Sequence, residues 1–250
     1  MDFRKTFDRI PESFDKYRPR YCEELFRELI TACDLNADKK VLEIGPGTGQ
    51  ATEPVLKTGC DYTAIELGEN FTFFMQEKFG AYPNFKIVNA DFEKYEFEKN
   101  SYDLVYSAAT IQWIPEKTAF TKTYEILKPG GYLAMFMTRS DERSADAELA
   151  DEIDRIYEKY FKVKQKYNCK LIYENVLNYG YVNWKYTEWK KERVLSAEEY
   201  ISYISTHCEH ITLEEPHKSD FYEGIRKAIM NAGNRIVITD TIPLYLIQKG

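Results

Sequence analysis

Five short apolar segments alternate with helical patterns between residues 40 and 138, and this alternation constrains the fold more than any other feature. The segments are KVLEI (40–44), YTAIE (62–66), FKIVNA (85–90), YDLVYSA (102–108) and GYLAMFMT (131–138). Between them, apolar side chains recur at helical spacing. Strands that alternate with helices specify a parallel sheet with right-handed crossovers. The sequence therefore predicts an α/β fold.

The pattern changes after residue 139, where a charged helix, an aromatic-rich extended stretch and two further helices precede a closing strand or strand pair. Ser196, with Glu199 three residues later, is typical of a helix start. We expect one domain over residues 1–250. Its predicted parts are an N-terminal helical cap (1–36), a ligand-binding core (37–139), an inserted lid (140–215), and a closing helix and strand (216–250).

Composition excludes several classes of protein. The formal net charge is −7 and the sequence pI is about 5.3, which argues against a large nucleic-acid-binding surface. The five cysteines are scattered without a CxxC pair, which favours a reduced protein and gives no zinc pattern. No apolar run is long enough for a signal peptide or a membrane span. We predict a soluble, cytoplasmic protein without a metal.

A glycine-rich turn, VLEIGPGTGQ (41–50), follows the first predicted strand. Such a turn places backbone N–H groups and a helix N-terminus at the carboxyl end of a parallel strand, where open α/β sheets bind ligands. The glycines are Gly45, Gly47 and Gly49, and Gln50 stands where a dinucleotide fingerprint has its third glycine. The turn therefore predicts a ligand site but does not by itself identify a dinucleotide.

Acidic residues end the next two predicted strands. Glu66 is suited to accept hydrogen bonds from the two hydroxyls of a ribose, and the alternative is a solvated carboxylate at a helix start. Asp91 is suited to accept from an adenine amine, with Leu67 or Phe92 flanking the ring. The alternative for Asp91 is an ordinary turn residue.

These motifs, taken in order, resemble a class I S-adenosylmethionine-dependent methyltransferase. The resemblance rests on E-x-G-x-G-x-G, the acids after the second and third strands, DLVYSA and LKPGG, and it covers roughly residues 14–138. ELGEN, IQWIP and residues 195–213 are similar to a small-molecule, methyltransferase type 11-like branch. FDKYRPRY resembles the entry segment of trans-aconitate methyltransferase relatives. The family implies a Rossmann-like, mostly parallel seven-stranded sheet with helices on both faces and an antiparallel last strand.

The resemblance also implies a cofactor, S-adenosyl-L-methionine, which leaves as S-adenosyl-L-homocysteine. Glu43 is expected to fix the glycine turn and to approach the cofactor amino group. Arg18 is expected to pair with its carboxylate, and a surface ion pair is the alternative. The implied cofactor-binding set is Tyr17, Arg18, Glu43, Gly45, Gly47, Gly49, Glu66, Leu67, Asp91, Phe92, Ser107 and Ala108.

Four residues are candidates for the methyl-acceptor end of the site. Gln112 and Trp113 follow the fourth strand, and Gln112 stands where relatives often have histidine. Trp113 would form an aromatic wall of the site and make a cation–π contact with the sulfonium. The alternative is that Trp113 only packs against a helix. His207 and His210 are candidates for a base or a substrate ligand, with ordinary loop histidines as the alternative.

Residues 157–203 are unusually aromatic, which suits either the wall of an apolar or planar substrate site or the packing of a small lobe. The aromatic residues concerned are Tyr157, Tyr160, Phe161, Tyr167, Tyr173, Tyr179, Tyr181, Trp184, Tyr186, Trp189, Tyr200 and Tyr203. No motif of base methylation is present. The sequence therefore favours a small-molecule acceptor over nucleic acid or membrane.

The prediction is methyl transfer from S-adenosylmethionine to an oxygen or nitrogen of a small molecule, with oxygen slightly favoured. Catalysis would rest on orientation, since an in-line displacement needs little other help. Two alternatives stay open. One is a protein that binds this cofactor or a nucleoside without turnover. The other is a nicotinamide-dependent oxidoreductase, against which Gln50 and the closing strand argue. A monomer and a homodimer are equally compatible with the sequence.

Overall fold

The computed structural model describes residues 3–142, 146–168 and 171–250, which form two compact units. The sheet unit comprises Pro19–Thr138, Cys169–Trp189 and Ile242–Gly250. The helical unit comprises Met1–Arg18, Arg139–Asn168 and Lys190–Thr241. Each unit is therefore assembled from segments that lie far apart in the sequence.

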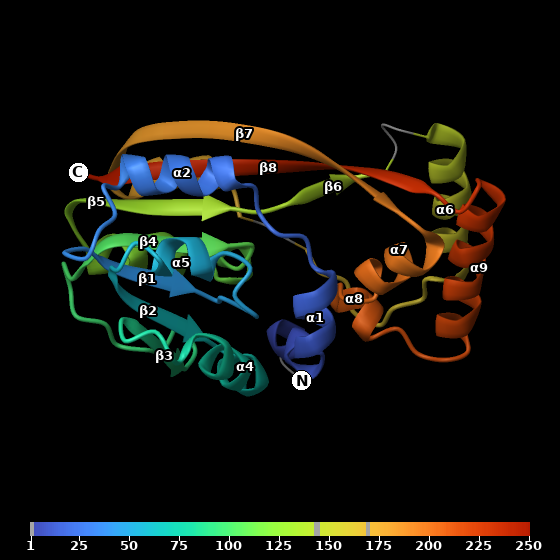
Figure 1. Cartoon of the computed structure of the whole chain (residues 1–250), viewed down its shortest axis with the longest axis horizontal. Helices are drawn as coiled ribbons and strands as arrows, with labels where there is room; N and C mark the ends of the chain where they lie inside the picture. The colour runs from blue at the N-terminus through green and yellow to red at the C-terminus, as the bar shows by residue number, and fades with distance from the viewer. Residues whose placement is uncertain (1–2, 143–145, 169–170) are drawn as a thin grey trace. The chain divides into compact units, whose positions relative to one another are not determined.

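Five parallel strands form the centre of the sheet unit. They are β1 (Lys40–Ile44), β2 (Asp61–Glu66), β3 (Phe85–Asn89), β4 (Tyr102–Ala108) and β5 (Leu127–Phe136), in the order β3-β2-β1-β4-β5. The last strand, β8 (Ile236–Lys249), pairs antiparallel with β5, and β7 (Tyr181–Leu195) pairs with β8 (Figure 1). The predicted mostly parallel sheet with an antiparallel last strand is confirmed, and with the short strand β6 (Arg139–Asp141), which also pairs with β8, the described strands form an eight-stranded sheet.

Helices cover both faces of this sheet, because successive side chains of a buried strand point to opposite sides. In β1, Val41 packs in the cluster that includes α2 (Glu23–Ala32), α3 (Thr52–Leu56) and α4 (Glu69–Phe79). Leu42 and Ile44 pack in the other cluster, with α5 (Glu116–Ile126) and η4 (Tyr173–Tyr179). Strand residues are consequently apolar on both sides, as the continuous apolar runs predicted.

The helical unit has a core of its own. Its elements are η1 (Phe3–Lys5), η2 (Phe7–Arg9), α1 (Pro11–Tyr17), β6 (Arg139–Asp141), α6 (Ala147–Tyr160), α7 (Ala197–Ile204), α8 (Cys208–Ile211) and α9 (His217–Asn231), with the adjoining parts of β7 and β8. Ile153 of α6, Tyr200 of α7 and Ile225 of α9 share one apolar cluster. Ser196 and Glu199 form the predicted capping box at the start of α7.

The structure divides the predicted lid differently. Residues 140–215 do not form one unit, since residues 169–189 belong to the sheet unit. The reason lies in side-chain packing: Val176 and Tyr181 are buried in the cluster of α5, and the Tyr181 hydroxyl donates to Thr123 Oγ1 at 2.8 Å. The predicted cap is divided as well, because residues 1–18 belong to the helical unit and α2 to the sheet unit.

Three elements of the structure have clear boundaries. The first long helix begins at Glu23, after an extended Cys22. The helix after the glycine turn begins at Thr52, because all three glycines of the turn have a positive φ. The closing segment is one long strand, Ile236–Lys249, which is one of the two arrangements that the sequence left open.

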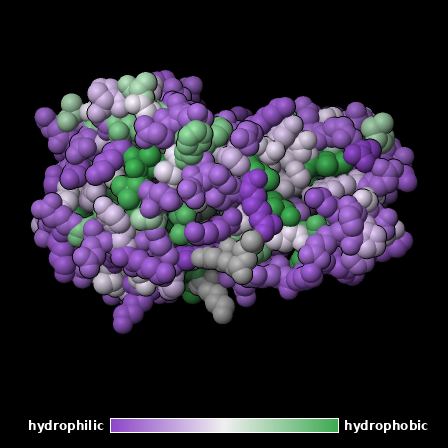
Figure 2. Space-filling view, turned by 90° about the horizontal axis from the view of Figure 1, so that it is seen from below, coloured by the Kyte–Doolittle hydropathy of each residue, from purple (hydrophilic) through white to green (hydrophobic). Residues whose placement is uncertain are grey.

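Among the described residues, none of the helices has the length and apolarity needed to cross a membrane. The face drawn in Figure 2 is mainly hydrophilic, and its hydrophobic areas are small and separate. Phe73 on α4 and Leu177 on η4 are among the exposed large apolar side chains of the sheet unit. Scattered exposed apolar residues of this kind are normal on a globular surface.

Candidate functional site

The glycine turn between β1 and α3 has a backbone that only glycine adopts without strain. Gly45, Gly47 and Gly49 have φ values of +64°, +58° and +82°. A Cβ atom on Gly45 would lie 2.3 Å from Thr110 Cγ2, and one on Gly49 would lie 2.5 Å from Phe79 Cε2. The turn is therefore closely packed between the loop after β4 and helix α4. Because its glycines have no side chains, only backbone atoms of these residues are available to a ligand.

Glu66 lies directly beside this turn. Its side chain is 7% exposed at the end of β2. Oε2 accepts a hydrogen bond from the Gly47 N–H at 3.1 Å, and Oε1 accepts one from the Gly68 N–H at 2.8 Å. The structure thus brings together the turn and the strand-end carboxylate that the sequence singled out.

At the end of β3, the predicted adenine-binding residues Asp91 and Phe92 make contacts within the protein. Asp91 Oδ1 accepts from the Glu93 N–H at 3.0 Å, which is the turn geometry of the alternative interpretation. Phe92 is buried, and its ring centroid lies 5.5 Å from that of Phe97. Leu67, after β2, is half-buried. Adenine recognition by these residues stays a prediction.

Asn89 is a residue of this region that the sequence analysis missed. Its Nδ2 donates to the backbone oxygens of Glu66 and Gly68 at 3.0 and 3.1 Å, and lies 3.1 Å from Thr72 Oγ1. It therefore ties β3 to the β2–α4 connection that carries Glu66. An asparagine at a strand end is typical of a turn, so no separate signal in the sequence indicated this role.

The loop after β4 closes over the start of the turn. Ser107 is buried, and its Oγ accepts from the Ile111 N–H at 2.9 Å and lies 3.4 Å from the Ile44 oxygen. Thr110 Oγ1 donates to the Gly45 oxygen at 2.9 Å. Ser107 therefore shapes this loop through protein contacts, while the adjacent Ala108 is half-buried.

Gln112 and Trp113 lie in the same loop, within the 3₁₀ turn η3 (Ile111–Trp113). Gln112 Nε2 donates to the Ala109 oxygen at 3.0 Å, and both side chains are half-buried. Because Thr110 holds this loop against Gly45, the two candidates, which directly follow Ile111 in the same loop, lie near the glycine turn in the fold. Their role toward an acceptor stays a prediction.

Tyr17 and Arg18 belong to the helical unit. Arg18 Nη2 donates to the Thr206 oxygen at 2.9 Å, and the guanidinium carbon lies 5.1 Å from the ring centroid of Phe14. Tyr17 is the last residue of α1 and directly precedes Arg18 in the sequence. Pairing of Arg18 with a cofactor carboxylate stays a prediction.

His210 lies in the aromatic core of the helical unit and is 4% exposed. Its Nε2 is 3.0 Å from the Tyr157 hydroxyl, and its Nδ1 is 3.5 Å from that of Tyr222. Burial lowers the pKa of His210 to about 3. A ring with this pKa is a weak base near neutral pH, and these contacts are those of a structural histidine.

His207 precedes α8, with its ring centroid 4.9 Å from that of Tyr203. Burial, and then the nearby charge of Arg18, lower the pKa of His207 well below its ordinary value. It is therefore neutral near pH 7. A catalytic role for either histidine stays a prediction, and the described contacts of His210 favour its structural alternative.

A buried cluster of oxygen atoms lies beneath the turn. Glu43 is 0% exposed, and its Oε2 accepts from Thr52 Oγ1 at 2.6 Å and from the Tyr62 hydroxyl. The hydroxyls of Tyr62 and Tyr106 are also hydrogen-bonded to each other. Burial is the main cause that raises the pKa of Glu43 to about 7. The sequence pointed to Glu43 but not to the tyrosines, which look like ordinary buried strand residues.

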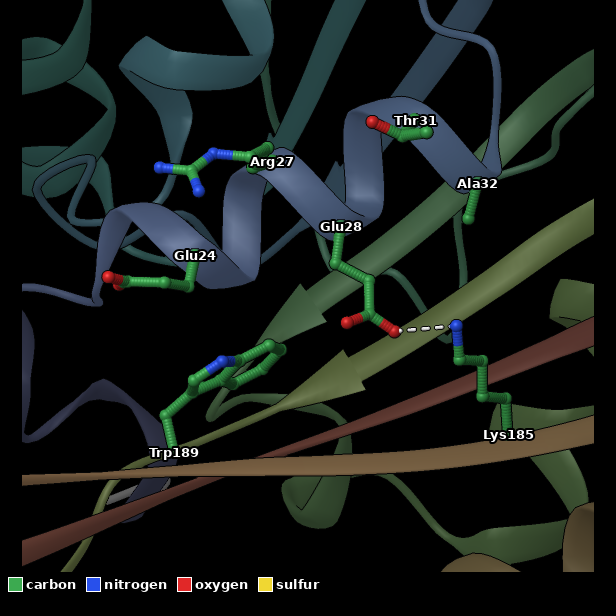
Figure 3. A pocket seen from close by; sticks show the side chains of 7 residues that line it. All are labelled: Glu24, Arg27, Glu28, Thr31, Ala32, Lys185 and Trp189. Carbon is green, nitrogen blue, oxygen red and sulfur yellow. Dashed lines mark ion pairs between the residues drawn. The ribbon is translucent and has the colours of Figure 1, made fainter.

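A separate hollow of about 440 Å³ in the sheet unit lies between α2 and β7 (Figure 3). Glu28 and Lys185 point toward each other there, with Nζ 2.9 Å from Oε1. The other lining residues are Glu24, Arg27, Thr31, Ala32 and Trp189. None of the predicted cofactor-binding or catalytic residues lines this hollow, and Trp189 is one of the aromatic residues noted in the 157–203 stretch. Within the described ranges, no group of three or more His, Cys, Asp and Glu side chains is arranged to hold a metal ion.

The comparison with protein families gives one match over this site. Residues 42–135 match the methyltransferase domain family. These residues run from β1 to β5 and include the glycine turn, Glu66, Asp91 and the loop after β4. They are similar to a methyltransferase domain. The methyltransferase domain thus coincides with the parallel half of the sheet, and the resemblance noted in the sequence is confirmed.

Two curated relatives share part of this domain. A malonyl-[acyl-carrier protein] O-methyltransferase from Marinomonas sp. is 34% identical over 140 residues, which are 54% of this chain and 51% of that protein. A ribosomal RNA small subunit methyltransferase A from Borreliella burgdorferi is 36% identical over 86 residues, 34% of this chain and 31% of that protein. The chain therefore spans about half the length of the first relative and about a third of the second.

The fold extends beyond the methyltransferase domain in solved structures. A phosphoethanolamine N-methyltransferase 2 from Haemonchus contortus, solved with S-adenosyl-L-methionine, matches with a TM-score of 0.57 and 17% identity. The match covers 100% of this chain and 60% of that one. At this identity the likeness shows the fold alone.

Proposed function

We propose that the protein is an S-adenosylmethionine-dependent methyltransferase that acts on a small molecule. One observation carries the proposal: three glycines with positive φ form a turn whose Gly47 N–H donates to the Glu66 carboxylate. This pairs an open backbone surface with a carboxylate at the carboxyl end of parallel strands, which is where such sheets bind nucleosides. The methyltransferase domain match over the same residues selects the cofactor.

The residues of the site fit this cofactor. A carboxylate offers about four acceptor positions, so Glu66 suits a ribose diol. Glu43 Oε1 is buried and has no hydrogen-bond partner among the described residues, so it suits a donor such as an ammonium group. Asp91, Leu67 and Phe92 would meet the adenine, while Ser107 and Ala108 would border the methionine part.

The cofactor would supply a sulfonium methyl group that is primed for displacement. The chain would hold the acceptor atom in line with that methyl and keep water out, and orientation of this kind can contribute about 7–11 kcal/mol to a barrier. Gln112 and Trp113 are the proposed residues at the acceptor end. The face of a tryptophan stabilises a cation by about 0.5–2 kcal/mol.

A carboxylate oxygen is the acceptor we favour. The curated relative from Marinomonas is an O-methyltransferase of a malonyl group, and the entry segment resembles trans-aconitate methyltransferase relatives. A carboxylate acceptor needs no general base, which agrees with the low pKa of His210. The ribosomal RNA relative suggests a second substrate class, but the net charge of −7 opposes binding to a polyanion.

The first test is calorimetric titration with S-adenosylmethionine, S-adenosylhomocysteine and NADH. We expect the two sulfur ligands to bind and NADH not to bind. Glu66→Ala should weaken their binding by about 10- to 100-fold, because it removes charge-assisted hydrogen bonds. Gly47→Val should do the same, since φ there is +58°. Glu69→Ala, on an exposed acid of α4, is the matched control and should change nothing.

Unchanged affinity in both site variants would contradict the proposed site, and NADH binding in place of the sulfur ligands would favour the oxidoreductase. The acceptor is then sought by release of S-adenosylhomocysteine with small carboxylates, phenols, amines and a ribosomal RNA fragment. Turnover with a carboxylate alone supports the proposed acceptor, and turnover with RNA contradicts it. Cofactor binding without turnover on any of them would favour a non-catalytic binding protein.

A further inference from the structure

Three hydroxyl groups from different elements converge on the buried carboxyl group of Glu43. Thr52 from α3 and Tyr62 from β2 both donate to Oε2, and Tyr106 from β4 bonds the Tyr62 hydroxyl. All four side chains are 0% exposed. Buried polar groups destabilise the folded state unless they are hydrogen-bonded. The bonds among these four side chains therefore form a hydrogen-bond network that the fold holds in place.

The network joins the two ends of the glycine turn. Glu43 precedes Gly45 by two residues, and Thr52 is the first residue of α3. The Tyr106 hydroxyl also lies 3.4 Å from the backbone oxygen of Ala51. Because the three glycines contribute no side chains to fix the turn, these bonds hold residues 43 and 52 together and so set the path of the backbone between them.

The hydroxyl chain can be satisfied in either protonation state of Glu43. With an ionised Glu43, Tyr106 donates to Tyr62, and Tyr62 donates to the carboxylate. With a protonated Glu43, the carboxyl group donates to Tyr62, Tyr62 donates to Tyr106, and Tyr106 donates to the Ala51 oxygen. Each hydroxyl has one hydrogen, and each arrangement uses it once.

The groups around Glu43 explain why both states exist near neutral pH. Burial raises its pKa to about 7, while the hydroxyls of Thr52, Tyr62 and Tyr106 act in the opposite direction. The titratable groups facing it are Tyr62 from β2 and Tyr106 from β4, and their own pKa values lie well above the ordinary tyrosine value because of burial. The tyrosines therefore stay protonated, and Glu43 is the member of the network that titrates.

We propose that Tyr62 and Tyr106 are positioning residues for cofactor binding, acting through Glu43 on the glycine turn. The inference rests on the proposed binding of S-adenosylmethionine at that turn. It also links binding to a proton: an ionised Glu43 favours the ammonium group of either ligand, and S-adenosylmethionine adds a sulfonium charge that S-adenosylhomocysteine lacks. The affinity for the first ligand should therefore rise with pH as Glu43 ionises, and the affinity for the second should change less.

The test is calorimetric titration of both ligands from pH 6 to pH 8.5 (chosen to bracket ionisation of Glu43) with Tyr62→Phe and Tyr106→Phe. Tyr62→Phe removes a donor to the carboxylate, so the midpoint of the pH profile should move upward. Affinity for S-adenosylmethionine at neutral pH should fall by about tenfold, the effect of one buried hydrogen bond. Tyr106→Phe should act in the same direction with a smaller effect.

Tyr181→Phe is the matched control, since it removes another buried hydroxyl of the sheet unit, bonded to Thr123 Oγ1 at 2.8 Å. It should lower the melting temperature and leave both affinities and the pH midpoint unchanged. Thr52→Val is the second test variant if Tyr62→Phe does not fold. In the ligand-free protein, the infrared band of the protonated Glu43 carboxyl, identified with Glu43→Gln, should titrate at higher pH in Tyr62→Phe.

Two outcomes would overturn the positioning role. One is native affinity and a native pH midpoint in both tyrosine variants, as in Tyr181→Phe. The other is an infrared carboxyl titration that Tyr62→Phe does not move. If the native protein binds neither sulfur ligand, both the proposed function and the positioning role are contradicted. This outcome is distinguished from the first two because it is seen in the native protein and not only in the variants.

Discussion

At the scale of single residues, two glycines with similar backbone conformations allow a test of how closely the glycine turn is packed. The test compares the loss of stability when each is replaced by alanine. Gly49 and Gly233 have nearly the same φ, +82° and +84°. A Cβ on Gly49 would meet Phe79 Cε2 at 2.5 Å, whereas nothing lies within 4 Å of a Cβ on Gly233. We expect Gly233→Ala to destabilise by about 1 kcal/mol through backbone strain, and Gly49→Ala by at least about 2 kcal/mol more.

Chemical denaturation of both variants measures this difference. Equal losses would mean that α4 yields readily around the turn, and would contradict the close packing of Gly49 against Phe79. The glycines and Glu66 could be identified from the sequence because each has a local reason, a tight turn or a strand end. Tyr62 and Tyr106 could not, because their importance comes from hydroxyls that meet across three strands.

At the scale of elements, an ion pair joins strands of the helical unit. Asp240 of β8 is 2% exposed, and its Oδ1 accepts from Arg193 Nη2 of β7 at 3.0 Å and from Ser140 Oγ of β6 at 2.7 Å. Arg193→Ala would leave a buried carboxylate without its cation. We expect a loss of about 3–5 kcal/mol, measured by thermal unfolding.

Arg226→Ala is the control, because Arg226 pairs with Glu198 and Glu223 on the surface of the same unit. Exposed pairs contribute about 0–1 kcal/mol, so its effect should be small. An equal effect of the two variants would mean that Asp240 gains solvent once Arg193 is removed. The double variant Arg193→Leu/Asp240→Leu should recover most of the loss, since neither charge is then left alone.

The order of strands and helices could be predicted because each element has its own periodicity. The division of the chain into two compact units could not be predicted from the sequence. Val176 and Tyr181 pack against α5, which ends at Ile126, far earlier in the chain, and the sequence around them shows only aromatic and polar residues. Long-range packing of this kind leaves no local signal, so the predicted lid included residues that complete the sheet.

At the scale of the whole molecule, histidine burial predicts how stability depends on pH. The pKa of His210 is about 3 in the folded protein, below the value of about 6.5 in an unfolded chain. The unfolded state therefore binds the proton more readily between these values, and protonation favours unfolding. His210 consequently leaves stability unaffected above pH 6.5 and progressively lowers it as the pH falls from 6.5 toward 3.

Melting temperatures of the native protein and His210→Gln between about pH 3.5 and 8 measure this effect, a range that covers most of the interval between the two pKa values and extends above it. We expect the variant to melt lower at pH 8, because its contacts with Tyr157 and Tyr222 change, but to lose less stability on acidification. His217→Gln is the control, since His217 is exposed on α9. An acid slope that is the same in all three proteins would mean that the His210 ring reaches solvent in the folded state. His210 would then have to be reconsidered as a proton acceptor in catalysis, because the burial that makes it a weak base would be absent.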